Sequence, residues 1–337
     1  MKLVVVDADV LGRRRTGDET YLRNLLRELA PLAPEAGIRL AAVTRRPDLV
    51  PEGIEPVELD VRSQELRMAF SLSRALRRLQ ADLCHTQYAL PLRPPCPSVV
   101  TIHDLSFARE PALMGRKDRL MFRLVVPRAA LMADRVLTVS ERTKQDLIEL
   151  YGISSRKIIV TPNGVDPVFA PGGGSRGYVL VVGAIQTRKN QLAALEAAAS
   201  VDLPLVVAGP EKDPELAKEL RRRGATIEGY VETERLADLY RGAACLVQAS
   251  RFEGFGLPVL EAMASGTPVV AVHEPALEEV AGEAAVFVDQ DQLAEGIRQA
   301  LRERDRLVAA GLERARAFSW HTTAERTLAV YREILGA

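Results

Sequence analysis

The stretch ACLVQASRFEGFGLPVLEAMASGTPVVAV, residues 244–272, contains both kinds of element from which we expect the chain to be built. Residues 244–250 and 268–272 are short apolar runs, which is the pattern of strands buried in a parallel sheet. Between them, Pro258 suits the first position of a helix and Gly266 suits its end. The stretch therefore predicts a strand, a turn, a helix and a second strand.

The same alternation of apolar runs and amphipathic stretches continues along the rest of the chain. Helices are predicted most clearly at 18–30 and at 141–151, where Ser140 suits the N-cap. Because strands that alternate with helices form parallel sheets, we predict an α/β protein with two doubly wound sheets. The further strands are expected at 2–8, 38–44, 82–86, 98–103, 135–140, 178–183, 204–209 and 284–288.

Residues 161–177, TPNGVDPVFAPGGGSRG, interrupt this alternation with three prolines and five glycines. Neither residue type suits the interior of a helix or strand, so this segment is predicted to be a hinge between two domains. The first domain is expected over residues 1–167 and the second over 168–318. In doubly wound sheets ligands bind at the carboxyl ends of the strands, so a cleft between the domains is expected to hold the substrate.

The composition is that of a soluble globular protein. The 337 residues are 47% hydrophobic, and 45 acidic residues balance 45 basic ones, which argues against nucleic acid as a partner. Cys84, Cys96 and Cys245 lie far apart, which argues against a disulfide framework or zinc site and fits a reducing cytoplasm. No apolar run reaches the roughly 18 residues of a membrane span. The N-terminal apolar run is too short for a signal peptide.

The turn after residue 250 is predicted to be an anion site. It joins the carboxyl end of a strand to the start of a helix, where backbone N–H groups near Gly256, Leu257 and Val259 point outward and the helix dipole is positive. Gly254 and Gly256 let an anion approach the backbone closely. The sequence therefore predicts that a phosphate group binds here.

Two acids, Glu253 and Glu261, flank this turn. Glu261 lies about one turn inside the predicted helix, and its side chain leans back toward the helix start. A carboxylate accepts two hydrogen bonds, which suits neighbouring hydroxyls of a sugar. With the anion site, the pair predicts a nucleotide sugar as the ligand. The alternative is a solvated acid in the first turn of a helix, where negative charge is favoured.

The segment EGFGLPVLEAMASGTPVVA, residues 253–271, resembles the signature of retaining glycosyltransferases of the GT-B fold, in the group 1 or family 4 class (GT4). Its two glutamates keep the family's spacing, with seven residues between them. The resemblance covers essentially the whole chain in the family's order. Its other motifs are TIHDLSF (101–107), TPNGVD (161–166), VGAIQTRKN (182–190), AGP (208–210) and FSWHTTAERTLAVYREIL (318–335).

The resemblance implies a fold and a reaction. The fold is GT-B, two Rossmann-like domains facing across a cleft, with a C-terminal helix over 319–337 that returns to the first domain. The reaction moves a hexose from a nucleoside diphosphate sugar, such as GDP-mannose or UDP-glucose, to a hydroxyl of a sugar, a lipid-linked molecule or a small molecule. It uses no metal ion and no other cofactor. A phosphate oxygen of the donor takes the acceptor's proton, so no protein base is expected.

The resemblance also implies which residues bind the donor and act in catalysis. Arg188 and Lys189 would hold the diphosphate and stabilise the charge that develops on it as the glycosidic bond breaks. Glu261 would hold the ribose, and Glu253 the hydroxyls of the transferred sugar. The alternative for the basic pair is a structural role at a helix start, where the dipole disfavours cations. The remaining donor-binding positions are Gly17, Gly183, Gly209, Gly254, Phe255, Gly256 and Leu257.

In the first half of the chain, His103 and Asp104 follow an apolar strand. The resemblance implies that His103 takes part in catalysis by contacting the donor sugar or organising the acceptor. Asp104 and Tyr21 are expected on the acceptor side, and the loop and helix over 13–26 would close over both substrates. A structural role is the alternative for His103. It is the expected role of the other histidines, which share no metal-ligand spacing: His85, His273 and His321.

Two further segments allow other interpretations. Residues 7–9, DAD, are similar to the metal-binding pair of GT-A glycosyltransferases and to the nucleophile pair of haloacid-dehalogenase phosphatases. The GT-A pair, however, comes late in its domain, and the lysine and later acidic pair of the phosphatases are not found in the first domain. Residues 114–132 predict either a helix in peripheral contact with an anionic membrane or a core helix with a basic solvent face, and we favour the core helix. This segment mixes Arg116, Lys117, Arg119, Met121, Phe122, Arg123 and Leu124.

Rival functions use the same features. A GT-B epimerase or phosphorylase would bind at the same nucleotide or phosphate site, and a nucleotide-sugar-binding protein without activity would bind the donor alone. The expected location is the cytoplasm, with the inner face of the membrane as an alternative. The donor base, the sugar, the acceptor and the oligomeric state do not follow from the sequence.

Overall fold

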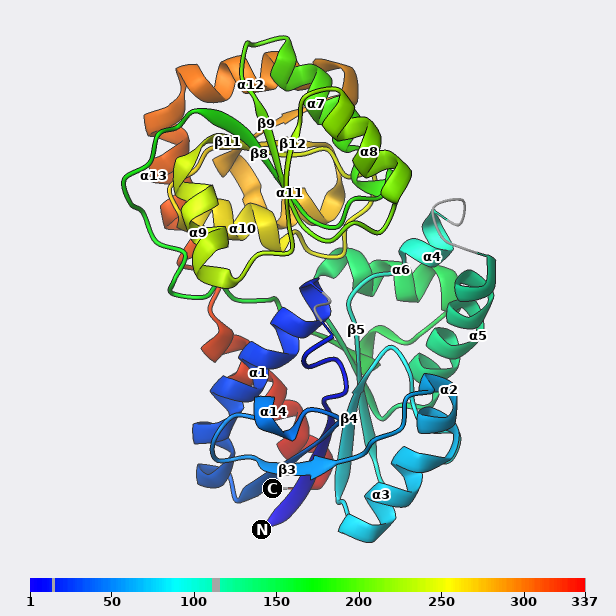
Figure 1. Cartoon of the computed structure of the whole chain (residues 1–337). Coiled ribbons are helices and arrows are strands. Elements are labelled where there is room, and N and C mark those ends of the chain that lie inside the picture. Colours follow the sequence, from blue (N-terminus) through cyan, green and yellow to red (C-terminus); the bar gives the residue numbers. More distant parts are fainter. Residues whose placement is uncertain (14–15, 111–115, 337) are drawn as a thin grey trace. The chain divides into compact units, whose positions relative to one another are not determined.

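The computed structural model describes residues 1–13, 16–110 and 116–336, without the side chains of residues 16 and 116–118. The chain forms two compact units, one of Met1–Gly164 with Trp320–Ala337 and one of Val165–Ser319. Figure 1 shows that each unit has its own sheet with helices around it. The predicted α/β class with two doubly wound parallel sheets is confirmed.

The sheet of the first unit has seven strands, all paired in parallel, in the order β3-β2-β1-β4-β5-β6-β7. Every residue of β5 is buried, as expected for a central strand of a parallel sheet with helices on both faces. The strands are β1 (Lys2–Asp7), β2 (Ile38–Thr44), β3 (Glu55–Glu58), β4 (Leu83–Gln87), β5 (Ser98–Ile102), β6 (Arg135–Thr138) and β7 (Ile158–Val160).

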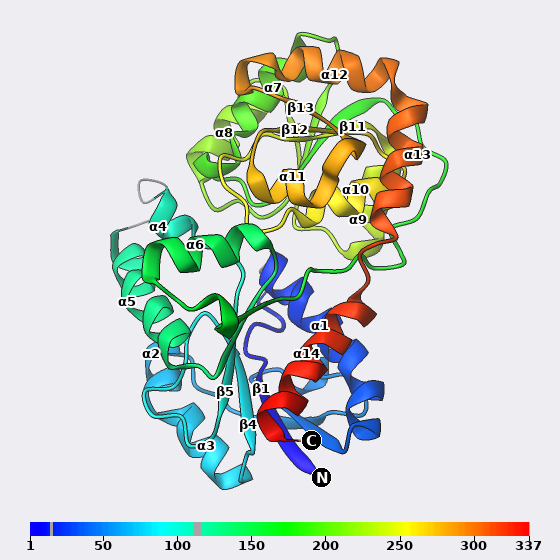
Figure 2. The same cartoon turned by 180° about the vertical axis from the view of Figure 1, so that it is seen from behind.

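The helices of the first unit include the C-terminal helix, which packs against α1 (Figure 2). Within this unit the hydroxyl of Thr323 donates to the carbonyl oxygen of Pro162 at 2.6 Å. Ser140 caps α6 as predicted, because its side chain accepts a hydrogen bond from the Thr143 N–H at 3.1 Å. The helices are α1 (Thr16–Glu35), α2 (Gln64–Leu66), α3 (Leu72–Leu79), α4 (Ser106–Arg109), α5 (Arg116–Met132), α6 (Glu141–Tyr151) and α14 (Trp320–Leu335), with short η1 (Pro47–Leu49), η4 (Ser155–Lys157) and the π-helical η2 (Arg67–Ser71).

The second unit has a six-stranded parallel sheet in the order β10-β9-β8-β11-β12-β13. Its strands are β8 (Tyr178–Val182), β9 (Leu205–Ala208), β10 (Thr226–Gly229), β11 (Ala243–Gln248), β12 (Val269–Val272) and β13 (Ala285–Val288). Its helices are α7 (Gln191–Ala199), α8 (Pro214–Arg222), α9 (Thr233–Gly242), α10 (Leu257–Ala264), α11 (Pro275–Ala281), α12 (Leu293–Arg302) and α13 (Arg304–Ala315), with short η5 (Thr187–Lys189), η6 (Gly282–Ala284) and η7 (Gln290–Gln292).

All ten predicted strands are present, but β3, β7 and β10 were not predicted. Each of these three lies at an edge of its sheet. An edge strand has a neighbour on one side only, so fewer of its side chains are buried. In β3 only Val57 is buried, and no residue of β10 is. Such strands therefore lack the apolar run that reveals a central strand.

The strand order reverses at one place in each sheet, between β1 and β4 and between β8 and β11. In open doubly wound sheets ligands bind outside the carboxyl ends of the strands at this switch point. The segments that follow β8 and β11 are residues 183–190 and 249–256, which carry the predicted basic pair and the first predicted glutamate. The topology of the second unit therefore brings these two segments to one edge of its sheet.

Helix α10 begins at Leu257, so Pro258 is its second residue and not its first as predicted. Its N-cap, Gly256, has a φ of +103°, and a Cβ at this position would lie 2.7 Å from a methyl carbon of Leu277. The helix ends at Ala264, and Gly266 follows with a φ of +70°. A side chain at position 256 would be both strained and crowded, so glycine is needed for the turn into the helix.

The thiols of Cys84 and Cys96 are hydrogen-bonded, although these residues are separated in the sequence. This hydrogen bond raises the pKa of Cys84 and lowers the pKa of Cys96, and both are free thiols. Across the described residues, the structure has no helix of the length and apolarity that a membrane span needs.

Candidate functional site

A cluster of three charged side chains lies at the switch point of the second unit. Lys189, the last residue of η5, forms an ion pair with Glu253 through Nζ and Oε1. The guanidinium of Arg188 lies 3.5 Å from the other carboxylate oxygen, Oε2. Arg188 also donates a hydrogen bond to the carbonyl oxygen of Phe252. The two segments that follow β8 and β11 are thus held together by their own side chains.

The carboxyl group of Glu253 is 7% exposed and remains ionised in this cluster. Burial alone would raise its pKa, but the charges of Lys189 and Arg188 outweigh burial and lower the pKa to about 2. Two cations therefore face one fixed carboxylate at neutral pH. A second anion, such as a diphosphate, would meet the same cations in a largely buried setting, where electrostatic interactions are stronger than in water.

Sequence reasoning missed Gln248, which supports this cluster. Its side-chain N–H donates to Glu253 Oε1 at 2.6 Å and to the hydroxyl of Ser250 at 3.1 Å. Gln248 is 1% exposed and is the last residue of β11. Gln248 could have been selected from the sequence because it is a polar residue inside the apolar run ACLVQAS. A buried amide needs hydrogen-bond partners, so such a residue indicates a polar cluster nearby.

The predicted glycines 183 and 209 are explained by close packing at the ends of β8 and β9. A Cβ at Gly209 would lie 2.1 Å from the carbonyl oxygen of Gly183, and its φ is +150°. A Cβ at Gly183 would lie 3.4 Å from Cε of Lys189. Gly209 therefore allows two backbone segments to approach, and Gly183 has a φ of +137°, a backbone conformation that favours glycine.

The second predicted glutamate, Glu261, has a different environment from the first. The hydroxyl of Tyr240 on α9 donates to Glu261 Oε2 at 2.7 Å. Among the described residues, Oε1 of Glu261 makes no hydrogen bond. Burial raises the pKa of Glu261 to about 7, even though the Tyr240 hydrogen bond lowers it, and the nearby Asp166 raises it further.

Tyr240 itself is completely buried, and no motif in the sequence marks it as a functional residue. Its ring packs edge-on against Phe169 with 5.7 Å between the ring centroids. Its carbonyl oxygen accepts a hydrogen bond from the hydroxyl of Thr267 at 2.7 Å. The ring and the backbone of Tyr240 are therefore both held by neighbouring residues. Its hydroxyl in turn holds one carboxylate oxygen of Glu261 in place.

The backbone at the start of α10 only partly matches the predicted anion site. The N–H of Val259 donates to the carbonyl oxygen of Gly256 at 3.0 Å, so this predicted donor is already used. The amide of Leu257 is the first of the helix and has no intrahelical acceptor by geometry. Phe255 is buried and packs edge-on against Phe318. Gly254 precedes Phe255 in the same turn.

In the first unit, His103 follows β5 and is 8% exposed. Its Nε2 lies 2.6 Å from the amide oxygen of Gln87, so this nitrogen carries the proton and donates. The rings of Tyr21 and Tyr88 pack against its ring with centroid distances of 4.7 and 5.5 Å. Burial lowers the pKa of His103, and the nearby Asp18 and Asp104 partly offset this. The imidazole is therefore held neutral at pH 7.

The other predicted residues of the first unit lie around His103. Tyr21 is completely buried, and its hydroxyl shares a hydrogen bond of 3.0 Å with Thr101, so the structure does not place it where an acceptor could meet it. Asp104 accepts a hydrogen bond from the Ser106 N–H at 2.8 Å. Gly17 is exposed in the first turn of α1. Residues 14 and 15 of the predicted closing loop lie outside the described residues.

The histidine His85 has the structural role that we expected. It is buried between the hydroxyl of Tyr331 at 2.6 Å and that of Thr101 at 2.7 Å. Burial lowers its pKa to about 3, and His103 lowers it further. Tyr21, Thr101, His85 and Tyr331 therefore form a chain of hydrogen bonds between uncharged side chains.

The two carboxylates of the DAD segment form ion pairs with arginines. Asp7 pairs with Arg67, which is itself completely buried. Asp9 pairs with Arg45 at 2.8 Å and also with Arg13. Three cations thus neutralise the two acids whose pattern is similar to a metal-binding or nucleophile pair. This arrangement supports the structural interpretation of residues 7–9.

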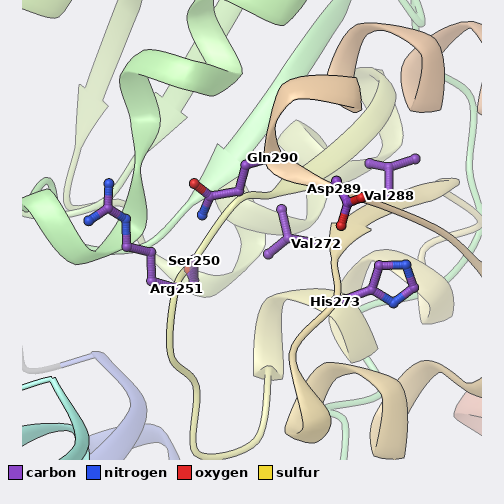
Figure 3. Close-up of a pocket in the computed structure, with 7 residues that line it drawn as sticks. All are labelled: Ser250, Arg251, Val272, His273, Val288, Asp289 and Gln290. Carbon is purple, nitrogen blue, oxygen red and sulfur yellow. The ribbon is translucent and has the colours of Figure 1, made fainter.

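A pocket of about 160 Å³ opens at the carboxyl ends of β11, β12 and β13 (Figure 3). Figure 3 shows the ring of His273 directed away from the other lining side chains. The pocket is smaller than the roughly 300–1,000 Å³ typical of small-molecule sites. The Arg251 N–H donates to the Arg188 carbonyl oxygen at 3.1 Å, so the pocket adjoins the charged cluster. Its lining residues are Ser250, Arg251, Val272, His273, Val288, Asp289 and Gln290.

The structure thus brings Arg188, Lys189 and Glu253 together in the second unit, with Gly183 beside the lysine. Glu261 is held separately by Tyr240, and His103 and Asp104 belong to the first unit. Two Rossmann-like parallel sheets, the second with a buried charged cluster at its switch point, define the class of the protein as the GT-B fold.

Comparison with known proteins identifies the family. Residues 173–317 match the family model described as glycosyl transferases group 1, and residues 15–169 match the model for glycosyltransferase family 4. O-antigen chain mannosyltransferase B of Escherichia coli is 30% identical over 267 residues, which cover 70% of this chain and 70% of that protein. The chain belongs to the group 1 glycosyltransferases, and it is an enzyme of this class.

Two further proteins extend the similarity over nearly the full length. D-inositol 3-phosphate glycosyltransferase of Acidothermus cellulolyticus is 29% identical over 380 residues, covering 96% of this chain and 83% of that protein. The solved structure of sucrose-phosphate synthase from Thermosynechococcus elongatus superposes with a TM-score of 0.82 and 21% identity over 100% of both chains. The second similarity shows the fold alone.

Proposed function

We propose that this glycosyltransferase moves a hexose, with retention of anomeric configuration, from a nucleoside diphosphate sugar to a hydroxyl of its acceptor. The observation that carries the proposal is the buried cluster of Lys189, Arg188 and Glu253 at the switch point beside the start of α10. Two cations in a largely buried setting suit the diphosphate of the donor. They also suit the charge that develops on the diphosphate when it leaves, because preorganised charges stabilise such a group without reorganisation.

Different residues of the second unit bind different parts of the donor. Lys189 and Arg188 bind the diphosphate, and Glu253 accepts hydrogen bonds from the transferred sugar. Glu261 holds the ribose through Oε1, since Oε2 is already bonded to Tyr240. The leaving diphosphate is stabilised by protein cations, and the enzyme works without a metal ion or other cofactor. A phosphate oxygen of the donor takes the acceptor proton.

The first unit receives the acceptor near His103. The neutral imidazole, fixed by Gln87, offers Nδ1 as a hydrogen-bond acceptor for a substrate hydroxyl. The donor is GDP-mannose or UDP-glucose, and the relative from Escherichia coli, named as a mannosyltransferase, supports the former. The acceptor is a sugar, a lipid-linked molecule or a small polyol. The enzyme works in the cytoplasm.

A screen of nucleotide sugars by thermal shift tests the donor, because a ligand that binds only the folded protein raises its melting temperature. The sugar that gives the largest shift is then offered with candidate acceptors, and the anomeric configuration of the product is determined by NMR. Retention with activity that survives a chelator supports the proposal. An inverted product, or activity that a chelator abolishes and magnesium restores, contradicts it.

The same reaction mixture separates the rival functions. A phosphorylase would release sugar phosphate when free phosphate is added, and an epimerase would convert the nucleotide sugar without an acceptor. A protein that only binds the donor would show the thermal shift and no turnover.

A further inference from the structure

Two of the three free cysteines of this protein meet in the first unit. Cys84 is the second residue of β4 and is paired with Ser98, the first residue of β5. Its N–H donates to the carbonyl oxygen of Pro97 at 3.0 Å. Cys96 is next to Pro97 in the chain and packs against the apolar cluster to which Cys84 belongs. The two side chains therefore share one face of the sheet, and their thiols are hydrogen-bonded.

The two thiols differ in their access to solvent. Cys84 is 1% exposed and packs among apolar side chains of α3, which lies beside β4 in Figure 1. Cys96 is half-buried, so a molecule in solution can approach it. The pair thus consists of an inner and an outer thiol.

The hydrogen bond also makes the two thiols chemically different. The Cys84 thiol donates to the Cys96 sulfur, which raises the pKa of Cys84 and lowers the pKa of Cys96. Burial and the charges of Asp82 and Asp134 oppose the lowering at Cys96 but do not outweigh the hydrogen bond. The thiolate is the nucleophilic form of cysteine, so the outer thiol is the more reactive of the two.

The third cysteine has neither feature. Cys245 is completely buried in β11, and burial raises its pKa to about 12 even though Arg304 lowers it. A thiol in such a setting is inert toward reagents in water. Cys245 is therefore an internal reference for the reactivity of the pair.

The two cysteines enclose residues 85–95, a segment that supports His103. Gln87 accepts a hydrogen bond from His103 Nε2 at 2.6 Å, and the ring of Tyr88 packs against the imidazole at 5.5 Å between centroids. Tyr88 has a φ of +59°, which non-glycine residues adopt only when their surroundings hold them there. A covalent bond between the ends of this segment would act on the surroundings of His103.

Two helices hold the outer part of the segment through its backbone. Arg128 on α5 donates to the carbonyl oxygens of residues 90–92 at 3.3, 3.2 and 2.7 Å. Ser73 on α3 donates to the carbonyl oxygen of Arg93 at 3.1 Å. The segment is thus anchored at its middle, and the thiol pair lies where its two ends come together.

Helix α5 makes the core contacts that we favoured for residues 114–132. Val126, Ala129 and Ala130 are buried in the core of the first unit. The solvent face of the helix carries exposed leucines as well as the expected basic residues. Residues 114 and 115 of the predicted segment, and the side chains of 116–118, lie outside the described part. Arg128 therefore reaches the 85–95 segment from a helix that is fixed in the core.

We propose that Cys84 and Cys96 form a reversible disulfide by exchange with a small-molecule disulfide such as oxidised glutathione, and that this bond restrains the 85–95 segment. Both cysteines are needed for the bond, and the outer one reacts first. In a reducing compartment such a bond is transient and reports the redox state. The proposal does not depend on the reaction proposed above.

The exchange has two steps. Cys96 loses its proton to water, and its thiolate attacks one sulfur of oxidised glutathione, which forms a mixed disulfide and releases one glutathione thiolate. Cys84 then gives its proton to a glutathione thiolate and attacks the Cys96 sulfur. The second glutathione leaves as a thiolate and takes a proton from water. Two protein thiols are oxidised to one disulfide, and one glutathione disulfide is reduced to two thiols.

A count of free thiols in the wild type tests the bond. The full chain is incubated with oxidised glutathione, unfolded and titrated with a thiol reagent. The count falls from three to one, because the pair is consumed and Cys245 is not, and dithiothreitol restores it. An unchanged count, or a stable glutathione adduct on a protein that keeps the Cys84 thiol, overturns the proposal.

Three single variants assign the roles of the cysteines. Cys84→Ser keeps a glutathione adduct on Cys96, since no second thiol displaces it. Cys96→Ser reacts at least about 10-fold more slowly than the wild type, because only buried thiols remain. Cys245→Ser is the matched control and forms the bond at the wild-type rate. Reaction of Cys96→Ser as fast as the wild type contradicts the assigned order.

Hydrogen exchange measured by mass spectrometry tests the restraint. In the oxidised wild type the backbone amides of residues 85–95 exchange at least about 3-fold more slowly than in the reduced protein, because the bond limits local opening. The amides of α8 in the second unit are the internal control and exchange equally in both forms. Cys84→Ser treated in the same way shows no slowing. Equal exchange of the segment in both wild-type forms overturns the proposed restraint.

Discussion

Two polar clusters of opposite character lie in the two units of this protein, and each includes residues within or just after central strands of its sheet. At the switch point of the second unit, Lys189 and Arg188 face the ionised carboxylate of Glu253. In the first unit, His85 within β4 and His103 after β5 are bonded to uncharged partners. The cluster of the second unit is thus built from charged groups, and the cluster around the two histidines is built from neutral hydrogen bonds.

The difference follows from what surrounds each group. Burial alone disfavours every charged form, and in the first unit little opposes it, so the pKa of His85 falls to about 3. In the second unit the cations overcome burial, and the pKa of Glu253 falls to about 2. The comparison teaches that the second unit is suited to a charged ligand group and the first to a neutral one such as a hydroxyl.

Lys189→Ala removes a cation from the charged cluster of the second unit, and we expect it to have the largest effect on turnover. Turnover should fall about 10²- to 10³-fold, the scale for removing one preorganised group that stabilises a developing charge. Steady-state kinetics measure this effect, with Lys218→Ala, an exposed lysine of α8, as the control. Full turnover in Lys189→Ala would refute the role of the cluster. Melting temperatures are compared in parallel, because the variant leaves Glu253 with Arg188 as its remaining cation.

Glu261→Gln tests the pH dependence of stability in the second unit. The folded protein holds Glu261 with a pKa of about 7, raised by burial from 4.5, so it keeps a proton that the unfolded chain releases. The wild type therefore loses free energy of unfolding as pH rises from about 4.5 to about 7, by about 3 kcal/mol in total. The variant lacks this loss.

Urea denaturation at several pH values measures the difference between the two proteins. The control for Glu261→Gln is Glu215→Gln, an exposed acid of α8, which should follow the wild type. Parallel stability curves for the wild type and Glu261→Gln across this pH range would show that Glu261 does not titrate there. For Glu253 the sign is the opposite, since its lowered pKa contributes stability that is lost as pH falls toward about 2.

His103→Ala removes the neutral imidazole of the first unit and tests its proposed contact with the acceptor. Turnover should fall about 10- to 100-fold, the scale of one buried hydrogen bond lost together with its packing. The thermal shift caused by the nucleotide sugar should remain, because the charged groups proposed to bind the donor, Arg188, Lys189 and the two glutamates, belong to the second unit. His321→Ala, an exposed histidine of α14, is the control. Loss of the donor shift in His103→Ala would mean that the division of roles is wrong.

Tyr240→Phe has the smallest expected effect. It removes the hydrogen bond to Glu261 Oε2, and the KM for the donor should rise about 5-fold. The bond lowers the pKa of Glu261, so its loss should move the acid limb of the kcat/KM profile to higher pH. Tyr178→Phe loses a comparable bond, to the Leu239 carbonyl oxygen, and should leave the profile in place. An unmoved profile in Tyr240→Phe would assign the tyrosine a purely structural role.

The sequence predicted most of the fold because central strands are buried on both faces and must be apolar throughout. The edge strand β10 was not predicted, because none of its residues is buried and it therefore has no apolar run. The charged pair at 188 and 189 and the glutamate at 253 could be selected because each follows an apolar strand. Their meeting at one switch point needed the strand order, which no local pattern contains.

By itself the sequence determined the α/β class, the family and the identity of the charged groups, because these depend on local periodicity and on short motifs. Only the tertiary structure decided which groups are ionised and which are exposed. Glu253 and Glu261 are both glutamates of one motif, yet their pKa values move in opposite directions. The cause is contact with distant residues, Lys189 in one case and Tyr240 in the other, and such contacts arise from the packing of the whole unit.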